Sequence, residues 1–306
     1  MIQVNFEGQD ITENISINAC YHDMYAEKQS DTLFIRFNDT DNLWDKWQPK
    51  VGDEITVNYG SIGTGKMYVY DALPTNGLYE LRAASAPPSV REVKNKAWQQ
   101  ISLLKMGAEI AENHGLSFIS YGVEDYLYPY ILQENTTDFY FLQKRCELEG
   151  CAFLVYDNKL VLYSEPYMEN QEPIETLPIG LDDDYRYQND TARLYGSCTI
   201  ERGSYQGSFD GENGMARVYT PDEKIMVGSA AEAERFAQNL LRSKNKNVKS
   251  GYFLGRILPG YAAASVLKLQ NERVPSWDGN IFLTHVRNDY AKGRAKLFFR
   301  KPLEGY

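Results

Sequence analysis

A glycine-rich segment, Gly60 to Lys66, is the stretch of this sequence that most resembles a binding site. Its Gly-x4-Gly-Lys spacing matches the part of a phosphate-binding loop in which backbone N–H groups and the lysine hold the phosphates. The next residue is Met67, where such loops carry the Ser or Thr that holds Mg²⁺, and Tyr68-Val69-Tyr70 then alternates like a strand where a helix should begin. We therefore interpret the segment as a hairpin loop and predict no nucleotide and no other cofactor.

Histidine is the side chain that most often performs acid–base catalysis, and the chain has three: His22, His114 and His285. No Ser or Cys stands in a nucleophile motif such as Gly-x-Ser-x-Gly that a histidine would activate. Glycoside cleavage by two carboxylates stays open, because the chain has 42 Asp and Glu whose separation in space the sequence does not give. The sequence thus predicts no catalytic residue and favours a protein that is not an enzyme.

Metal-binding residue types are present, but their spacing is wrong for a closed site. Cys146 and Cys151 are separated by four residues, yet a tetrahedral site needs four ligands and no second pair stands nearby. The run Asp182-Asp183-Asp184 lacks the Gly and distal Glu of a calcium loop, so we interpret it as a solvated surface loop. We predict no metal site, and we expect Cys20, Cys146, Cys151 and Cys198 to be free thiols.

The overall composition predicts a folded, mainly β protein. The chain has 306 residues, of which 43% are hydrophobic, which suggests two or three domains of ordinary size. Its 23 tyrosines suit strands that are half buried. A net charge of −10 opposes tight binding to nucleic acid. The first residues lack the pattern of a signal peptide, and no apolar run reaches membrane-spanning length, so we expect neither export by a cleaved signal nor a membrane anchor.

Residues 1–88 predict a small antiparallel barrel or sandwich, because short alternating segments follow one another between turn-rich pieces. The apolar positions that define these strands are Ile2, Val4 and Phe6; Ile15 and Ile17; Leu33, Ile35 and Phe37; Ile55, Val57 and Tyr59; Met67 and Val69; and Leu78 and Leu81.

Residues 89–165 predict a compact α/β module. Ser89 and Glu92 form a capping box, and apolar residues at steps of three and four from Val93 to Ala111 predict a helix that ends at His114-Gly115. A strand at 116–121 follows, then a second helix from Thr137 to Gly150, and then a hairpin that turns at Asp157-Asn158. We expect Trp98 and Leu104 to anchor this module.

Residues 166–306 predict a linker and a second barrel with one packed helix. Prolines and the acidic run between about 165 and 185 are typical of a linker or long surface loop. A capping box at Ser229 and Glu232 starts the helix. Strands are expected at 192–200, 216–220, 252–257, 266–269, 281–286 and 295–299.

Several motifs resemble the late control D family of phage tail proteins, the baseplate hub family that also forms the first part of type VI secretion spike proteins. They are Ala97-Trp98, then Ile110-Ala111-Glu112-Asn113-His114-Gly115-Leu116, then Gln133 with Thr137-Asp138 and Phe141-Leu142, and then Gly150. Shorter similarities flank them, at Trp47, Pro49 and Gly52-Asp53 and at Leu258-Pro259-Gly260 and Trp277-Asp278-Gly279.

This resemblance implies two barrels similar to tail-tube subunits, with the α/β module inserted between them, and no catalysis. It implies a homotrimer that joins the hexameric tail tube to a trimeric spike in the baseplate of a contractile tail, in contact with other baseplate proteins. DNA would meet it only in passage through the channel, and assembly would occur in the cytoplasm of the bacterial host. Because the sequence has no room for the spike's own needle, we expect a separate spike. The alternatives are a hub-like domain of a long non-contractile tail or, less favoured, a tail-borne cell-wall hydrolase.

Overall fold

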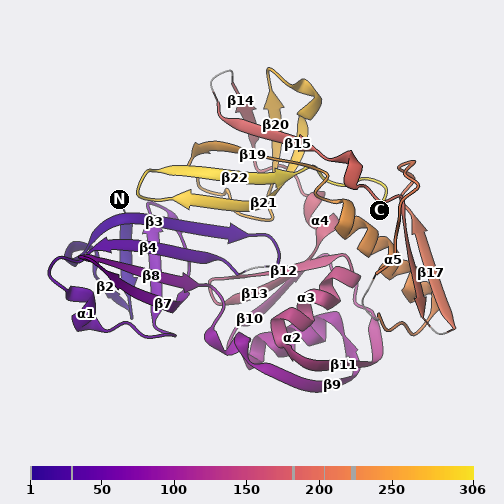
Figure 1. Cartoon of the computed structure of the whole chain (residues 1–306), viewed down its shortest axis with the longest axis horizontal. Helices are drawn as coiled ribbons and strands as arrows, with labels where there is room; N and C mark the ends of the chain where they lie inside the picture. The colour runs from indigo at the N-terminus through magenta and orange to yellow at the C-terminus, as the bar shows by residue number, and fades with distance from the viewer. Residues whose placement is uncertain (1, 29, 181–182, 203, 222–224) are drawn as a thin grey trace.

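The computed structural model describes residues 2–28, 30–180, 183–202, 204–221 and 225–306. Strands predominate, as the sequence predicts, and the helices are few and short (Figure 1). The α-helices are α1 (Leu43–Trp47), α2 (Leu103–Asn113), α3 (Asp138–Leu148), α4 (Glu165–Glu169) and α5 (Ala230–Asn245). Among the described residues, none of these helices has the length and apolar composition needed to cross a bilayer.

The N-terminal strands lie where the alternating pattern predicts them. They are β1 (Ile2–Phe6), β2 (Gln9–Asp10), β3 (Ser16–Tyr25), β4 (Thr32–Asn38), β5 (Glu54–Tyr59), β6 (Ile62–Gly63), β7 (Met67–Thr75) and β8 (Leu78–Ala84), with a 3-10 turn at Thr12–Asn14. Alternate residues of these strands point to one side and form a core around Trp44, which α1 contributes and which stacks on Phe37 at 4.3 Å between ring centroids.

The middle module contains β9 (Val93–Ser102), β10 (Ser117–Tyr121), β11 (Leu127–Thr137), β12 (Cys151–Tyr156) and β13 (Lys159–Ser164), together with α2 and α3, and a 3-10 turn at Pro88–Arg91 precedes it. The predicted hairpin is confirmed: Asp157 and Asn158 both adopt positive φ angles between β12 and β13. The predicted helix after Thr137 is also confirmed, and the Thr137 side chain caps it.

The helix predicted to begin near Glu92 is wrong over its first ten residues. Val93 to Ser102 form strand β9, which pairs with β11, and the helix begins at Leu103 with Ser102 as its cap. A step of four residues is also two steps of two, so Val93 and Ala97 fit a strand as well as a helix. Both are exposed on β9, and Trp98 points into the core.

The C-terminal strands are β14 (Thr176–Ile179), β15 (Tyr185–Asn189), β16 (Ser197–Arg202), β17 (Tyr205–Asp210), β18 (Val218–Tyr219), β19 (Lys249–Arg256), β20 (Val266–Asn271), β21 (Gly279–Asp289) and β22 (Arg294–Arg300). The 3-10 turns are Thr191–Arg193 and Pro275–Trp277. The predicted linker is in part ordered structure, because α4 and β14 lie within it. Of the acidic run, Asp182 lies outside the described residues, whereas Asp183 accepts a hydrogen bond from the Gly180 N–H at 2.7 Å.

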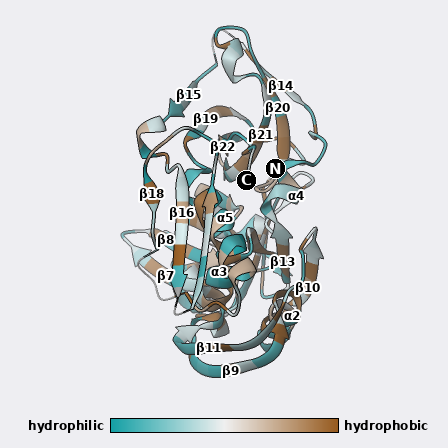
Figure 2. Cartoon of the chain, turned by 90° about the vertical axis from the view of Figure 1, so that its right-hand side faces the viewer, coloured by the Kyte–Doolittle hydropathy of each residue, from teal (hydrophilic) through white to brown (hydrophobic). Residues whose placement is uncertain are grey.

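Helix α5 packs elsewhere than the sequence suggests. Its buried residues, Phe236 and Leu240 among them, join the core of the middle module, with β16 and β17 against the helix. The sequence places this helix with the second barrel instead. In Figure 2, β16 lies beside α5, while the β9–β11 ribbon and the β14–β20 pair occupy opposite ends of the molecule.

One 14-stranded sheet joins the two ends of the chain. Its main path runs in the order β15-β19-β22-β21-β3-β4-β8-β7-β5-β1-β2, and off this path β6 pairs with β5, β20 with β21, and β14 with β20. Strand β3 pairs antiparallel with β21, so that Asp23 lies opposite Arg287; we call this pairing the seam. Strand pairing among the described residues closes neither half of this sheet into a ring of hydrogen bonds.

The same strand arrangement occurs on both sides of the seam. The N-terminal repeat consists of β3, β4, β8 and β7 with β5 against the start of β7; the C-terminal repeat consists of β15, β19, β22 and β21 with β20 against the start of β21. In each repeat the first and second strands pair, and the last two form a hairpin.

Details of the backbone match as well. Tyr70 in β7 and Thr284 in β21 are each left unpaired at a β-bulge. Val69 and Leu283, the residues before the two bulges, each form hydrogen bonds through both N–H and C=O, at 2.8 to 2.9 Å. Their partners are a short segment in each repeat, residues 52–53 for Val69 and residues 264–265 for Leu283. In these segments Gly52 has φ +99° and Ala264 has φ +66°. The two repeats therefore share strand order, register and irregularities.

Candidate functional site

The glycine-rich segment lies in a hairpin, as predicted. Gly60 and Ser61 turn the chain between β5 and β6, and β7 follows from Met67. The Lys66 ammonium binds the carboxylate of Glu54 at 2.7 Å. A phosphate cradle needs a helix N-terminus after the glycines, and a strand follows here.

His114 belongs to a group that the sequence did not reveal. Its Nδ1 lies 2.8 Å from the Ser89 hydroxyl, and its Nε2 lies 2.9 Å from the Asp138 carboxylate. Ser, His and Asp in hydrogen-bonded series are the components of a hydrolase triad. Ser89 and His114 are 25 residues apart, and no motif links them in the sequence.

Burial and hydrogen bonding favour a structural role for this group. The side chains of His114 and Asp138 are 1% and 3% exposed. Lys94 and Gln133 also donate to Asp138, at 2.7 and 2.9 Å, and Gln133 accepts from the Trp98 indole N–H at 3.2 Å. Burial raises the pKa of Asp138, but these hydrogen bonds outweigh it and hold the pKa below its usual value.

The network explains which residues carry the family resemblance. Trp98, His114, Gln133 and Asp138 come from four different segments, and each bonds to another member. They connect β9, the end of α2, β11 and the start of α3. We interpret the network as the means by which the middle module holds these elements in register.

His22 and His285 lie at the seam, on opposite faces of the sheet. His285 bonds Asp23 at 2.6 Å, and Arg287 binds the same carboxylate at 2.8 Å. His22 is fully buried, with its Nδ1 3.0 Å from the Tyr290 hydroxyl, and burial lowers its pKa to about 4. These contacts tie the two repeats together.

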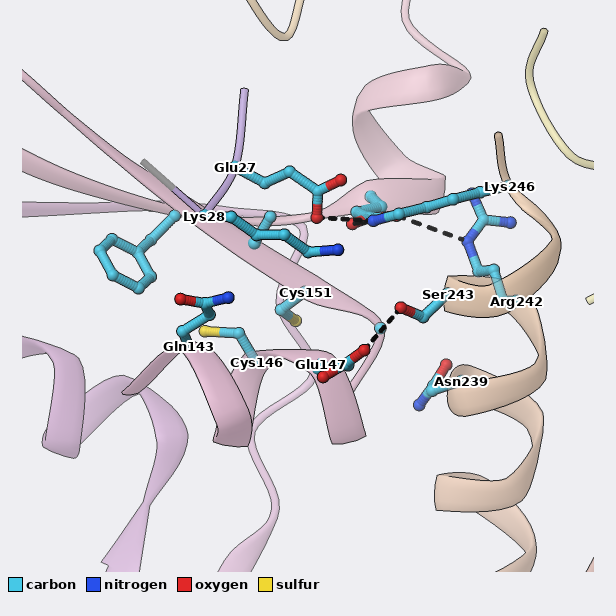
Figure 3. Close-up of a pocket in the computed structure, with 14 residues that line it drawn as sticks. Glu27, Lys28, Gln143, Cys146, Glu147, Cys151, Asn239, Arg242, Ser243 and Lys246 are labelled. Carbon is cyan, nitrogen blue, oxygen red and sulfur yellow. Dashed lines mark hydrogen bonds and ion pairs between the residues drawn. The ribbon is translucent and has the colours of Figure 1, made fainter. Parts of the chain in front are cut away.

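The four cysteines are all buried and unpaired. Cys146 and Cys151 lie near each other at the cavity shown in Figure 3, and burial raises the pKa of both thiols. A high thiol pKa disfavours the thiolate that binds metals. The described residues contain no group of three or more His, Cys, Asp or Glu arranged to hold a metal ion.

A cluster of charged side chains, all buried except the half-buried Glu27, joins all three regions of the chain, and we call it the junction cluster. Its members are Glu27, which follows β3; Glu165 and Glu169 of α4; Arg242 of α5 and Lys246 just after it; and Arg300 of β22. Three carboxylates meet three cations, so the cluster is formally neutral.

The geometry of the junction cluster is that of close, charge-assisted hydrogen bonds. Glu169 accepts from both Arg242 and Arg300 at 2.5 Å. Lys246 donates to Glu165 at 2.5 Å and to Glu27 at 2.6 Å. Burial raises the pKa of Glu169, but the two guanidinium groups more than compensate and hold it below its usual value.

Beside the cluster, α3 and α5 enclose a cavity of about 20 Å³. Figure 3 shows Lys246 extending toward Glu27 above this cavity, and Ser243 bonded to Glu147 across it, at 2.8 Å. The volume is that of about one water molecule. The arrangement is suited to holding the regions together and has no space for a substrate.

The fold is that of phage tail proteins. A 43 kDa tail protein of prophage MuSo2 from Shewanella oneidensis matches with a TM-score of 0.76 and 13% identity, over 98% of this chain and 97% of that one. A tail protein from Neisseria meningitidis MC58 matches with a TM-score of 0.75 and 12% identity, over 98% and 95%.

A third solved structure extends the likeness to secretion systems. The Escherichia coli c3393 protein, a component of the type VI secretion system described as similar to the T4 tail proteins gp27 and gp5, matches with a TM-score of 0.64 and 12% identity, over 99% of this chain and 78% of that one. The sequence matches no protein-family model and no curated protein. The predicted resemblance to phage tail and type VI secretion proteins is thus confirmed in the fold.

Proposed function

We propose that this protein is the structural hub of a phage or phage-like contractile tail, a homotrimer that joins the hexameric tail tube to a trimeric spike. The observation that carries the proposal is the duplication within the sheet: two repeats of one topology lie side by side in a single chain. The likeness to tail proteins over 98% of the chain supports it.

The duplication offers a way to match two symmetries. Three chains with two repeats each present six similar units around one axis, which fits a six-fold tube. The regions that occur once per chain, the middle module and α5, keep three-fold symmetry for the spike. Closed rings form when the rotation between neighbouring units closes, and similar repeats meet that condition approximately.

The proposed role assigns a purpose to each part of the chain. Residues 1–88 and the sheet strands of 166–306 are the tube-like units, and residues 89–165 are the spike-facing module. The protein would lie in the baseplate of the virion tail, against tube, spike and other baseplate proteins, with DNA only in passage. The burial of His114 and Asp138 supports a role without catalysis.

Light scattering coupled to size exclusion tests the proposal, on the protein alone and with the tube and spike proteins of the same tail. We expect a trimer in the presence of both partners. A free chain that is monomeric at low concentration is compatible with this, because assembly contacts depend on mass action. A dimer, or a monomer that persists with both partners, would contradict the proposal.

A further inference from the structure

Each repeat ends, on the side away from the seam, in a strand edge that has no strand partner among the described residues. One is the outer edge of β7 after its bulge, residues 71–75. The other is the outer edge of β15, which pairs only with β19. Free edges present unpaired N–H and C=O groups and are templates for pairing with another strand.

The duplication shows what each edge is equivalent to. Strand β7 corresponds to β21, and β15 corresponds to β3, because each holds the same place in its repeat. The strands β21 and β3 pair with each other at the seam. Within the chain, therefore, the last strand of one repeat already pairs with the first strand of the other.

We propose that β7 of one copy pairs antiparallel with β15 of a second copy, repeating the seam between chains. The proposal rests on the hub function above and identifies the surface that closes its ring. Three copies would then alternate three internal seams with three intermolecular ones.

The register of this pairing follows from the matched bulges. At the seam Arg287 lies opposite Asp23. Counting from the bulges, Leu73 corresponds to Arg287. Gln188 pairs with β19 as Asp23 pairs with β4, and β19 and β4 hold equivalent registers against β22 and β8, so Gln188 corresponds to Asp23. Leu73 of one copy therefore lies opposite Gln188 of the next.

Two differences make the intermolecular pairing weaker than the seam. The internal pair Arg287–Asp23 is an ion pair at 2.8 Å, whereas Leu73 and Gln188 are uncharged. Pro74 occupies the position of Asn288, two residues before Tyr290, whose N–H donates across the seam to Cys20 C=O. Alternate N–H groups of a strand point to the same side, so the N–H at the position of Asn288 also faces the seam. Proline has no N–H to donate, so the intermolecular ladder has one bond fewer. Copies would then pair stably only when the whole ring assembles.

Disulfide trapping tests the pairing. Leu73→Cys with Gln188→Cys places two thiols at a directly opposed pair between copies, where Cα atoms are about 4.5 Å apart and a disulfide fits. The native cysteines are buried and do not compete in the folded protein. With tube and spike proteins present and under mild oxidation, we expect most of the chain to migrate as covalent trimer and dimer on non-reducing gels.

The matched control is Leu73→Cys with Asn189→Cys, which moves one thiol to the other face of the sheet and should give little cross-linking. Two outcomes would overturn the pairing and leave the hub function standing. Light scattering would show trimers, but either the first variant would not cross-link or both variants would cross-link equally. The absence of trimers with both partners present would overturn both.

Discussion

Arg242 is 2% exposed, and its guanidinium depends on Glu169 and Glu165 for compensation of its charge. Without Arg242, Glu169 keeps Arg300, but the cluster then holds three carboxylates against two cations. An uncompensated buried charge of this kind costs about 3–5 kcal/mol. We expect Arg242→Met to lower the free energy of unfolding by that amount, measured by urea denaturation.

A control of the same chemistry is Arg193→Met. Arg193 also binds a carboxylate, that of Asp190, at 2.8 Å, but its side chain is 80% exposed. Exposed pairs contribute about 0–1 kcal/mol, so this variant should unfold nearly as the parent does. Equal losses in the two variants would show that the junction cluster adds no more than a surface pair.

Asp31 provides a prediction about pH. It is 4% exposed, accepts a hydrogen bond from the Tyr25 N–H at 2.9 Å, and lines a cavity of about 330 Å³. Burial raises its pKa to about 7 from 3.8. The folded state therefore holds a proton that the unfolded state releases, and the stability that Asp31 contributes is lost as pH rises from about 4 to about 7.

Asp31→Asn should remove this pH dependence. The amide has nearly the same shape and keeps an oxygen for the Tyr25 N–H. At pH 8 we expect the variant to be more stable than the parent by at least about 1 kcal/mol, and at pH 4 the difference should nearly vanish. Urea denaturation of both proteins at the two pH values measures it. A constant difference at both values would rule out titration of Asp31 as the cause.

Sequence reasoning could not find either polar cluster, for a physical reason. Lys246 and Glu27 are 219 residues apart, and His114 and Asp138 are 24 apart without a motif between them. Such pairs exist only after the chain has folded. What the sequence did supply was the likeness to tail hub motifs, and Trp98, His114, Gln133 and Asp138 of those motifs lie in one network.

At the scale of elements, the sequence predicted helix starts and turns correctly where a residue type has one common structural role. Thr137 and Ser229 cap the helices that they were expected to begin. Asp157-Asn158 turns the predicted hairpin because both residues tolerate positive φ. The helix prediction for Val93 to Ile101 failed because a spacing of four residues fits both a helix and a strand. In the folded chain this segment pairs with β11 and is therefore a strand.

Because α2 begins at Leu103, the leucine that packs into the core of the middle module is Leu103 and not Leu104. Leu103 is fully buried in the core of the middle module, whereas Leu104 is half buried at its margin. We expect Leu103→Ala to cost about 2–5 kcal/mol and Leu104→Ala clearly less. Thermal melting of the two variants side by side measures this. A larger loss for Leu104→Ala would mean that the helix presents a different face to the core.

At the scale of the whole molecule, the two repeats exchange residues across the seam. Met24 lies near the end of β3 in the N-terminal repeat, yet it belongs to the hydrophobic core of the C-terminal repeat. Tyr290 follows β21 of the C-terminal repeat, yet it lies in the core of the N-terminal repeat. Ile257 packs against both cores. Neither core is therefore complete without residues from the other half of the chain.

This exchange predicts that the repeats unfold as one unit, although 88 residues form a domain of ordinary size. Hydrogen exchange followed by mass spectrometry, at increasing urea concentration below the transition, gives an opening free energy for each segment. We expect β4 and β22, one from each repeat, to open with the same free energy and the same dependence on urea. Tyr290→Ala removes a C-terminal residue from the N-terminal core and should lower the opening free energy of both strands equally, by about 3–5 kcal/mol. An effect on β4 alone would mean that the repeats are separate folding units joined only by a pair of strands. Equal effects would instead mean that each chain would enter the proposed ring with its two repeats already fixed at the angle that the seam sets.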